Sequence, residues 1–185
     1  MKTLESDYQE LRRIAFPAYA ARQRYMHTFH TKDPHMPEGF EEYLDPVLSL
    51  LQAANVGPRE VHVTVDEKIV KPGMSQRRPG PHVDGCFQVG NGWGHEGGWN
   101  HTCNNIPVLK RMAIIVAATV AGCRAWRGVF RGDPQNDGDC SHFVSGPSEV
   151  LKPSTGYLLS PDCIHESMVF AEETQRQFLR IAFAV

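Results

Sequence analysis

The sequence has no apolar run that approaches the roughly 20 residues a membrane-spanning helix needs, and its mean hydropathy is −0.37. It also lacks a strong excess of either charge, with 19 Lys and Arg against 21 Asp and Glu. A strongly basic nucleic-acid-binding protein and a polyanionic tail are therefore disfavoured, although a local basic groove is not. Charged residues stand at the start with no apolar stretch after them, so we expect neither a secretory signal nor a membrane partner.

CxxC pairs are absent too. The five cysteines occupy scattered positions, namely Cys86, Cys103, Cys123, Cys140 and Cys163. An odd, scattered set is typical of reduced thiols rather than of a disulfide framework, and it predicts a cytoplasmic protein. At about 150 residues per domain, the 185 residues predict one domain with an extension. Hydrophobic residues make up 41% of the chain, which is enough for one sizeable core.

The N-terminal third has helical periodicity. Apolar residues at helical spacing predict a helix within residues 1–30, with a break or kink at Pro17. A second amphipathic helix is predicted over residues 38–54, where six apolar side chains fall on one stripe before a Gly-Pro pair ends it. We therefore expect residues 1–58 to form a helical support for the rest of the chain.

From about residue 59 the pattern is that of strands. Val61, Val63 and Val65 alternate with polar residues, which is the period of a half-buried strand. A continuous apolar run and four later segments predict further strands, at about 112–120, 149–152, 156–160, 164–170 and 175–185. Short strands without intervening helices predict an antiparallel sandwich or barrel. The predicted fold class is therefore mainly β with N-terminal helices (α+β), with residues 59–185 as the core of one compact unit.

His82 and Asp84 are the strongest candidates for chemistry. Residues i and i+2 of a strand point to the same face, so an imidazole and a carboxylate can converge there on one divalent ion. A surface pair or a hydrogen-bonded pair is the alternative, because this spacing also arises by chance. Farther along, His165 follows a turn glycine, an apolar strand and a short loop, and it opens the next strand. This context favours the interpretation of His82 and Asp84 as metal ligands.

Two arginines follow on the last predicted strand. Arg176 and Arg180 share parity and therefore one face, while both faces of the strand carry apolar residues. At least one guanidinium is thus expected in a low-dielectric site, where it needs an anionic partner. That partner is either a carboxylate of the protein or an anionic ligand held by the planar fork of the arginine.

The order His-x-Asp, a distal His and then an Arg some ten to fifteen residues later resembles the Fe(II)/2-oxoglutarate-dependent dioxygenases. The resemblance covers about residues 60–185 and implies a double-stranded β-helix, also called a jelly roll, with the N-terminal part packed on its outer sheet. His82, Asp84 and His165 match the facial triad of that family. Arg176 matches the arginine that binds the distal carboxylate of 2-oxoglutarate, and Arg180 matches the spacing seen in other members.

The resemblance also implies the reaction. Fe(II), 2-oxoglutarate as cosubstrate and dioxygen would carry out an oxidative decarboxylation to succinate and CO2 that is coupled to hydroxylation of a substrate. A small or medium-sized organic molecule is the favoured substrate, and a nucleic acid or a protein side chain stays open as an alternative. Fold does not fix function, so the substrate itself is not readable from the sequence.

Further residues are candidates for substrate contacts. A glycine-rich segment after Asp84 contains Trp93, His95 and Trp99, and it is interpreted either as a lid or as a static connector. Arg124 and Trp126 could line the mouth of a pocket, as could Arg77 and Arg78, which precede His82. Solvated surface charge and ordinary packing are the alternatives for these residues.

Two other functions compete with the oxygenase. One is a cupin-like, metal-dependent isomerase or epimerase, which has no need of a buried arginine paired to a cosubstrate. The other is a metal-free binding or structural jelly-roll module. In that case His82 would only form hydrogen bonds, and Arg176 would pair with an acid such as Glu166 or Glu172.

Overall fold

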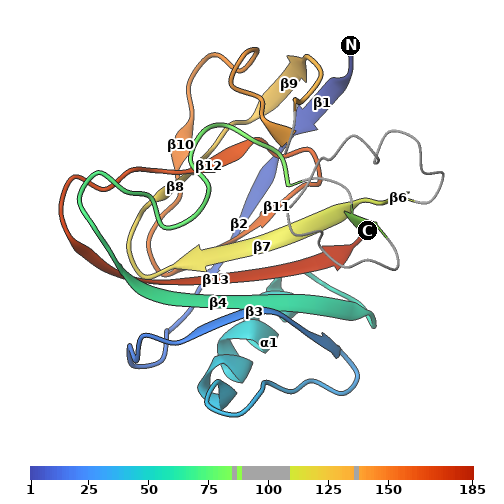
Figure 1. Ribbon diagram of the computed structural model, residues 1–185. Coiled ribbons are helices and arrows are strands. Elements are labelled where there is room, and N and C mark those ends of the chain that lie inside the picture. The colour runs from blue at the N-terminus through green and yellow to red at the C-terminus, as the bar shows by residue number, and fades with distance from the viewer. Residues whose placement is uncertain (85–86, 89–108, 136–137) are drawn as a thin grey trace.

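A six-stranded antiparallel sheet lies between a helix and a smaller sheet in the computed structural model (Figure 1). The structure describes residues 1–84, 87–88, 109–135 and 138–185. In spatial order the large sheet contains β2 (Tyr8–Arg13), β11 (Thr155–Leu159), β7 (Met112–Ala118), β13 (Thr174–Ala184), β4 (Glu60–Val70) and β3 (Gln23–His30). The small sheet contains β10 (Glu149–Val150), β8 (Cys123–Ala125) and β12 (His165–Ser167).

Two further strand pairs complete the described secondary structure. They are β1 (Thr3–Ser6) with β9 (Gly128–Arg131), and β5 (Phe87–Gln88) with β6 (Leu109–Lys110). The fold is therefore mainly β with antiparallel sheets, which is consistent with a β-sandwich. In the part of the chain that the structure describes, the strands form separate sheets and do not close into the barrel that the sequence led us to expect.

The two faces of the large sheet have different partners. Odd-numbered β4 residues such as Val63 pack with Ile115 and Leu179 against the helix α1 (Leu44–Ala53), which follows a 3₁₀ turn at Glu41–Tyr43. On the opposite face, apolar side chains of β7, β11 and β13 pack against the small sheet. The strands predicted from alternation and from the continuous apolar run are confirmed as β4, β7 and β13.

The prediction of a helix within residues 1–30 is wrong. These residues form β1, β2 and β3 instead, and β2 is an edge strand that pairs only with β11. An edge strand buries few side chains, so its apolar residues need not alternate and here they mimic helical spacing. The predicted helix over residues 38–54 is confirmed as α1, where Val47, Leu50 and Leu51 are buried. No helix among the described residues has both the length and the apolar character to cross a bilayer.

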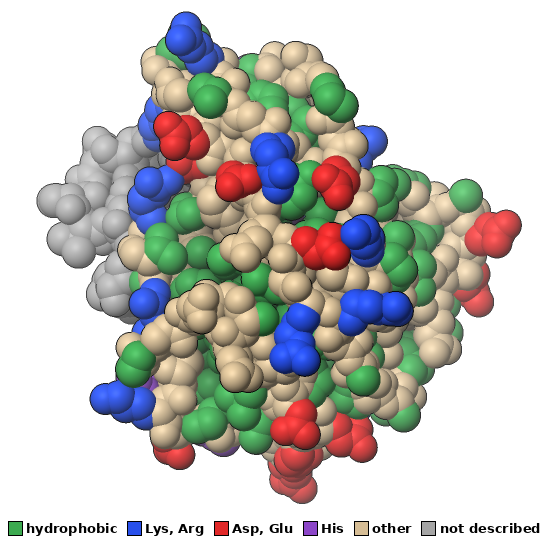
Figure 2. Space-filling model, turned by 180° about the vertical axis from the view of Figure 1, so that it is seen from behind, with side chains coloured by type: hydrophobic (Ala, Val, Ile, Leu, Met, Phe, Trp, Pro, Cys, Tyr) green, Lys and Arg blue, Asp and Glu red, His purple; other side chains and the backbone are tan. Residues whose placement is uncertain are grey.

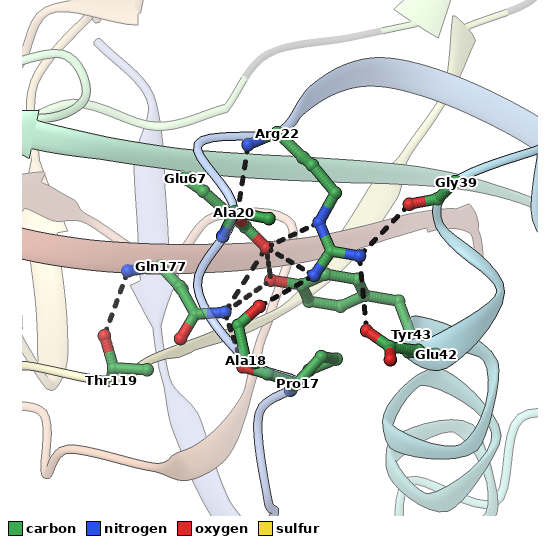
Figure 3. A network of polar contacts seen from close by, with 10 residues as sticks. All are labelled: Pro17, Ala18, Ala20, Arg22, Gly39, Glu42, Tyr43, Glu67, Thr119 and Gln177. Carbon is green, nitrogen blue, oxygen red and sulfur yellow. Dashed lines mark hydrogen bonds and ion pairs between the residues drawn. The ribbon is translucent and has the colours of Figure 1, made fainter.

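A buried polar network attaches the N-terminal segment to the large sheet (Figure 3). The Glu67 carboxylate, fully buried on the α1 side of β4, accepts hydrogen bonds from the Ala20 and Arg22 backbone N–H groups at 2.7 and 3.1 Å. It also accepts one from the Tyr43 hydroxyl at 2.7 Å and pairs with the Arg22 guanidinium at 3.0 Å. On the surface shown in Figure 2, basic and acidic side chains are interspersed, in keeping with the net charge of −2.

Candidate metal centre

His82 and His165 lie opposite each other as a hydrogen-bonded antiparallel pair. Each backbone N–H donates to the carbonyl of the other residue at 3.0 Å. Residues paired in this way point their side chains to the same side, and the two imidazole rings lie 4.6 Å apart between centroids. Two histidines separated by 83 positions in the sequence are thus neighbours in space.

Asp84 joins the two histidines, as the i, i+2 spacing predicts. Its Oδ1 lies 3.9 Å from His82 Nε2 and 4.0 Å from His165 Nε2. One ligand atom from each of the three residues lies within 4.8 Å of the others, and this is the one such group of His, Cys, Asp and Glu among the described residues. The sequence prediction that these three side chains converge is confirmed.

Backbone carbonyls orient both rings. His82 Nδ1 lies 2.7 Å from the carbonyl oxygen of Gly80, and His165 Nδ1 lies 3.0 Å from that of Cys163. A carbonyl only accepts, so each Nδ1 donates to it, and Nε2 is the ring atom nearest to Asp84 in both histidines. Gly80 has φ +79°, a conformation that glycine adopts without strain, and its carbonyl lies within hydrogen-bond distance of His82 Nδ1.

The protonation states also suit metal binding. Burial, and then the neighbouring His165, lowers the pKa of His82 to about 3, so this ring is neutral at physiological pH. Burial opposes ionisation of Asp84, but the neighbouring Arg180 cation outweighs it and holds the pKa of Asp84 well below its usual range. The result is a neutral imidazole beside a carboxylate, which are the forms that coordinate metals.

The donor set therefore suits a divalent metal ion. Two ligand atoms at about 2.1 Å from one ion and at right angles to each other lie about 3 Å apart. The distances of 3.9 and 4.0 Å from the Asp84 Oδ1 to the two Nε2 atoms exceed this value by about 1 Å, which small side-chain rotations can remove. Two imidazoles and one carboxylate are the ligands of the facial triad that binds non-haem iron.

The three residues open into a cavity of about 430 Å³ between the large sheet and the small sheet. Its apolar wall includes Ile114, Val116, Leu159 and Phe178, from the face of the large sheet that is turned away from α1. Its charged lining comprises Arg77, Arg78, Asp84, Glu166 and Arg180. A volume of this size suits a small organic ligand.

The two candidate arginines occupy different positions. Arg180 lines the cavity, and its Nη1 lies 3.3 Å from Asp84 Oδ2, beside the three candidate ligands. Arg176 is 1% exposed and does not line this cavity. Its guanidinium donates to the Val120 carbonyl, the Gln76 side-chain oxygen and the Cys123 sulfur, and among the described residues no carboxylate pairs with it. Glu166, which was one possible partner, pairs with Arg124 instead.

Two thiols lie near the candidate ligands. Cys163 is 1% exposed, and burial raises its pKa to about 12, so it stays a neutral, inert thiol. Cys123 lines the cavity, and its sulfur lies 3.4 Å from Arg176 Nη2. Cys123 thus separates the cavity from the buried guanidinium of Arg176.

The predicted substrate residues do not gather at the cavity. Arg124 pairs with Glu166 and lies over the Trp126 ring at 5.4 Å, but neither Arg124 nor Trp126 lines the cavity. Trp126 is packed in a third core cluster, together with Leu4, Val83, Cys140 and Ile164. The other three predicted residues, Trp93, His95 and Trp99, lie outside the described residues.

Several cavity residues were not predicted, among them Thr64, Tyr25 and Met26. Thr64 is on the polar side of the alternation in β4, so that pattern could have identified it. Tyr25 and Met26 are on β3, within the segment for which the sequence favoured a helix. Met26 has φ +54°, and the pairing of β3 with β4 shifts register there, so a bulge turns this part of the strand towards the cavity.

No family model matches the chain, and no curated protein matches it significantly. We therefore base the functional proposal on the residues of this chain and on the motif resemblance described above.

Proposed function

We propose that this protein is a non-haem Fe(II)- and 2-oxoglutarate-dependent oxygenase that hydroxylates a small or medium-sized organic molecule. The observation that carries the proposal is the convergence of His82, Asp84 and His165 in the wall of a cavity of about 430 Å³. Two imidazoles and one carboxylate leave part of the coordination sphere of iron open for other ligands. We also propose that the two facing sheets belong to a double-stranded β-helix.

The protein's own residues would hold and shield the metal. The Nε2 atoms of His82 and His165 and the carboxylate of Asp84 are the ligands, and the Gly80 and Cys163 carbonyls fix the two rings. Arg180 holds Oδ2 of Asp84, which directs Oδ1 to the histidines. When bound, Fe(II) with 2-oxoglutarate and dioxygen supplies an oxidation in which 2-oxoglutarate becomes succinate and CO2 while a substrate C–H bond is hydroxylated.

Arg176 is the proposed anchor for the distal carboxylate of 2-oxoglutarate. Arg180 already pairs with Asp84 at the candidate metal ligands, whereas Arg176 lies four residues along β13, or about 13 Å away between Cα atoms. A buried guanidinium with only neutral acceptors gains most from a ligand carboxylate. The carboxylate would displace the weak acceptor Cys123 from Nη2. A cupin-like isomerase has no need of such an arginine, so this residue favours the oxygenase.

Iron binding tests the triad. The protein is purified under argon, freed of metal and titrated with Fe(II) and 2-oxoglutarate, and we expect a weak visible absorption band that requires both additions. Asp84→Ala should lose stoichiometric iron, because the substitution removes a ligand. It also leaves Arg180 without its carboxylate, so circular dichroism checks that the variant is folded. The matched control is Asp7→Ala, since Asp7 is an exposed aspartate paired with Arg127. Unchanged iron stoichiometry in Asp84→Ala would show that the triad assignment is wrong.

The same absorption band measures the affinity for 2-oxoglutarate. Arg176→Gln should raise the dissociation constant about 10- to 100-fold, because hydrogen bonds to charged groups contribute about 1.5–3 kcal/mol. Iron stoichiometry should not change, because Arg176 touches none of the three ligands. If Arg180→Gln weakens 2-oxoglutarate binding and Arg176→Gln does not, the two arginines have exchanged roles.

A further inference from the structure

Arg77 is a cavity residue to which the oxygenase chemistry assigns no role. It lies in the loop after β4, five positions before His82, and its side chain lines the cavity with 30% of its surface exposed. Its guanidinium carbon lies 5.5 Å from the centroid of the Tyr25 ring and 5.6 Å from that of Phe178. Both aromatic residues also line the cavity, so the planar cation contacts two rings of the cavity wall.

A buried carboxylate also contacts the same guanidinium. Arg77 Nη1 lies 3.5 Å from Oδ2 of Asp66, whose side chain is fully buried on β4. Gln23 donates a hydrogen bond to the other oxygen of Asp66 at 3.0 Å, so the carboxylate itself cannot rotate freely. Arg77 is therefore preorganised rather than a solvated surface charge.

The charges around Arg77 do not cancel. Asp66 contributes one negative charge, and it is shared between Arg77 and Lys68, whose Nζ lies 3.4 Å from the same oxygen. Among the described residues, Arg77 and Lys68 thus share a single carboxylate, so Asp66 alone does not neutralise the positive charge of Arg77 beside the cavity. The remaining acids of the lining have their own partners, because Asp84 pairs with Arg180 and Glu166 pairs with Arg124. An anionic group on a ligand is the complement of this arrangement.

We infer that the substrate carries a carboxylate on an otherwise apolar body, and that Arg77 binds this carboxylate. The inference rests on the proposed function, because it takes the bound acid to be the substrate of the oxygenase. Arg77 presents a planar fork that matches a carboxylate, and Ile114, Val116 and Leu159 supply apolar wall for the rest of the molecule. Asp66 and Tyr25 act as positioning residues for Arg77.

Binding of a small acid and its neutral analogue tests the inference without iron. Metal-free protein is titrated by calorimetry with phenylacetate and with phenylacetamide, which has nearly the same shape and no charge. We expect phenylacetate to bind at least about tenfold more tightly, because a charge-assisted hydrogen bond is replaced by a weaker neutral one. Arg77→Gln should abolish this preference.

Arg24→Gln is the matched control, because Arg24 is an exposed arginine on β3 that does not line the cavity. It removes the same charge and should keep the preference for the acid. Arg77→Lys keeps a cation beside Asp66 and so protects the fold. It should still lose most of the preference for the acid, because an ammonium group neither stacks on aromatic rings nor forms the paired hydrogen bonds of a guanidinium. Circular dichroism checks that each variant is folded.

The outcomes separate this inference from the oxygenase proposal. Equal binding of acid and amide, no binding of either, or a preference that survives in both Arg77 variants overturns the carboxylate subsite. A preference for the acid in a protein that gives no Fe(II) and 2-oxoglutarate band keeps the subsite and refutes the oxygenase. An Fe(II) and 2-oxoglutarate absorption band in a protein that shows no preference for the acid supports the oxygenase and refutes the carboxylate subsite.

Discussion

Replacing Glu67 by Gln should destabilise the fold strongly and leave the candidate metal centre intact. The Glu67 carboxylate is fully buried, and the donors around it include the Arg22 guanidinium at 3.0 Å and the Tyr43 hydroxyl at 2.7 Å (Figure 3). Removing one charge of a buried pair leaves the other uncompensated, which costs about 3–5 kcal/mol. Against a total stability of about 5–15 kcal/mol, this loss should lower the melting temperature by roughly 10 °C for a chain of this size.

The assay compares thermal and urea-induced unfolding of the wild type and of Glu67→Gln, with Glu42→Gln as the control. Glu42 contacts the same Arg22 at 3.3 Å, but its side chain is 65% exposed, so its loss should change stability by less than about 1 kcal/mol. Iron binding should be unchanged in both variants, because Glu67 faces α1 and not the cavity. Equal stability losses in the two variants would refute the claim that burial makes the Glu67 pair strong.

The pH dependence of the same difference gives a second check. Burial opposes ionisation of Glu67, but the surrounding donors outweigh it and lower its pKa from 4.5 to about 2. A carboxyl whose pKa is lower in the folded state stabilises the fold above its unfolded-state pKa. The contribution of Glu67 is therefore complete above about pH 4.5 and is lost as the pH falls towards about 2. The stability gap between wild type and Glu67→Gln should narrow over that window.

Two further predictions concern the turn before His82 and the helix. Gly80→Ala and Gly39→Ala replace glycines with φ +79° and +81°, so each variant should lose about 1–2 kcal/mol of stability. Only Gly80→Ala should weaken iron binding, because the Gly80 carbonyl orients the His82 ring. Equal iron affinity in the two variants would contradict that role. Leu50→Ala should lower the free energy of unfolding by about 2–5 kcal/mol, because Leu50 is fully buried between α1 and the large sheet. A loss below about 1 kcal/mol, measured by urea unfolding, would show that α1 is not part of the cooperative core.

Periodicity predicted the central strands because their two faces are both constrained. Val61, Val63 and Val65 are fully buried against the helix side, so the sequence had to alternate there. The same reasoning failed over residues 1–30, where β2 has one strand neighbour and mostly exposed side chains. Burial constrains few positions in such a strand. Charged residues with apolar residues spaced between them therefore also fit the pattern of an amphipathic helix.

The candidate site was predictable in its residues but not in its surroundings. The i, i+2 rule placed His82 and Asp84 on one face, and the family resemblance supplied His165. Which side chains form the cavity depends on strand pairing, which no local pattern encodes. Arg124 illustrates this, because it pairs with the cavity residue Glu166 and yet does not itself line the cavity, whereas its neighbour Cys123 does.

Two consecutive acidic residues on β4, Asp66 and Glu67, have different roles on opposite faces of the strand. Asp66 holds Arg77 beside the cavity, while Glu67 secures the chain's N-terminal segment beneath the helix. A slip of one position against β13 would bring either Lys68 to the place of Glu67 or Val65 to the place of Asp66. In either case one of the two arginines, Arg22 or Arg77, would lose its carboxylate partner. An insertion or deletion of a single residue in this strand would therefore disable either folding or ligand selection.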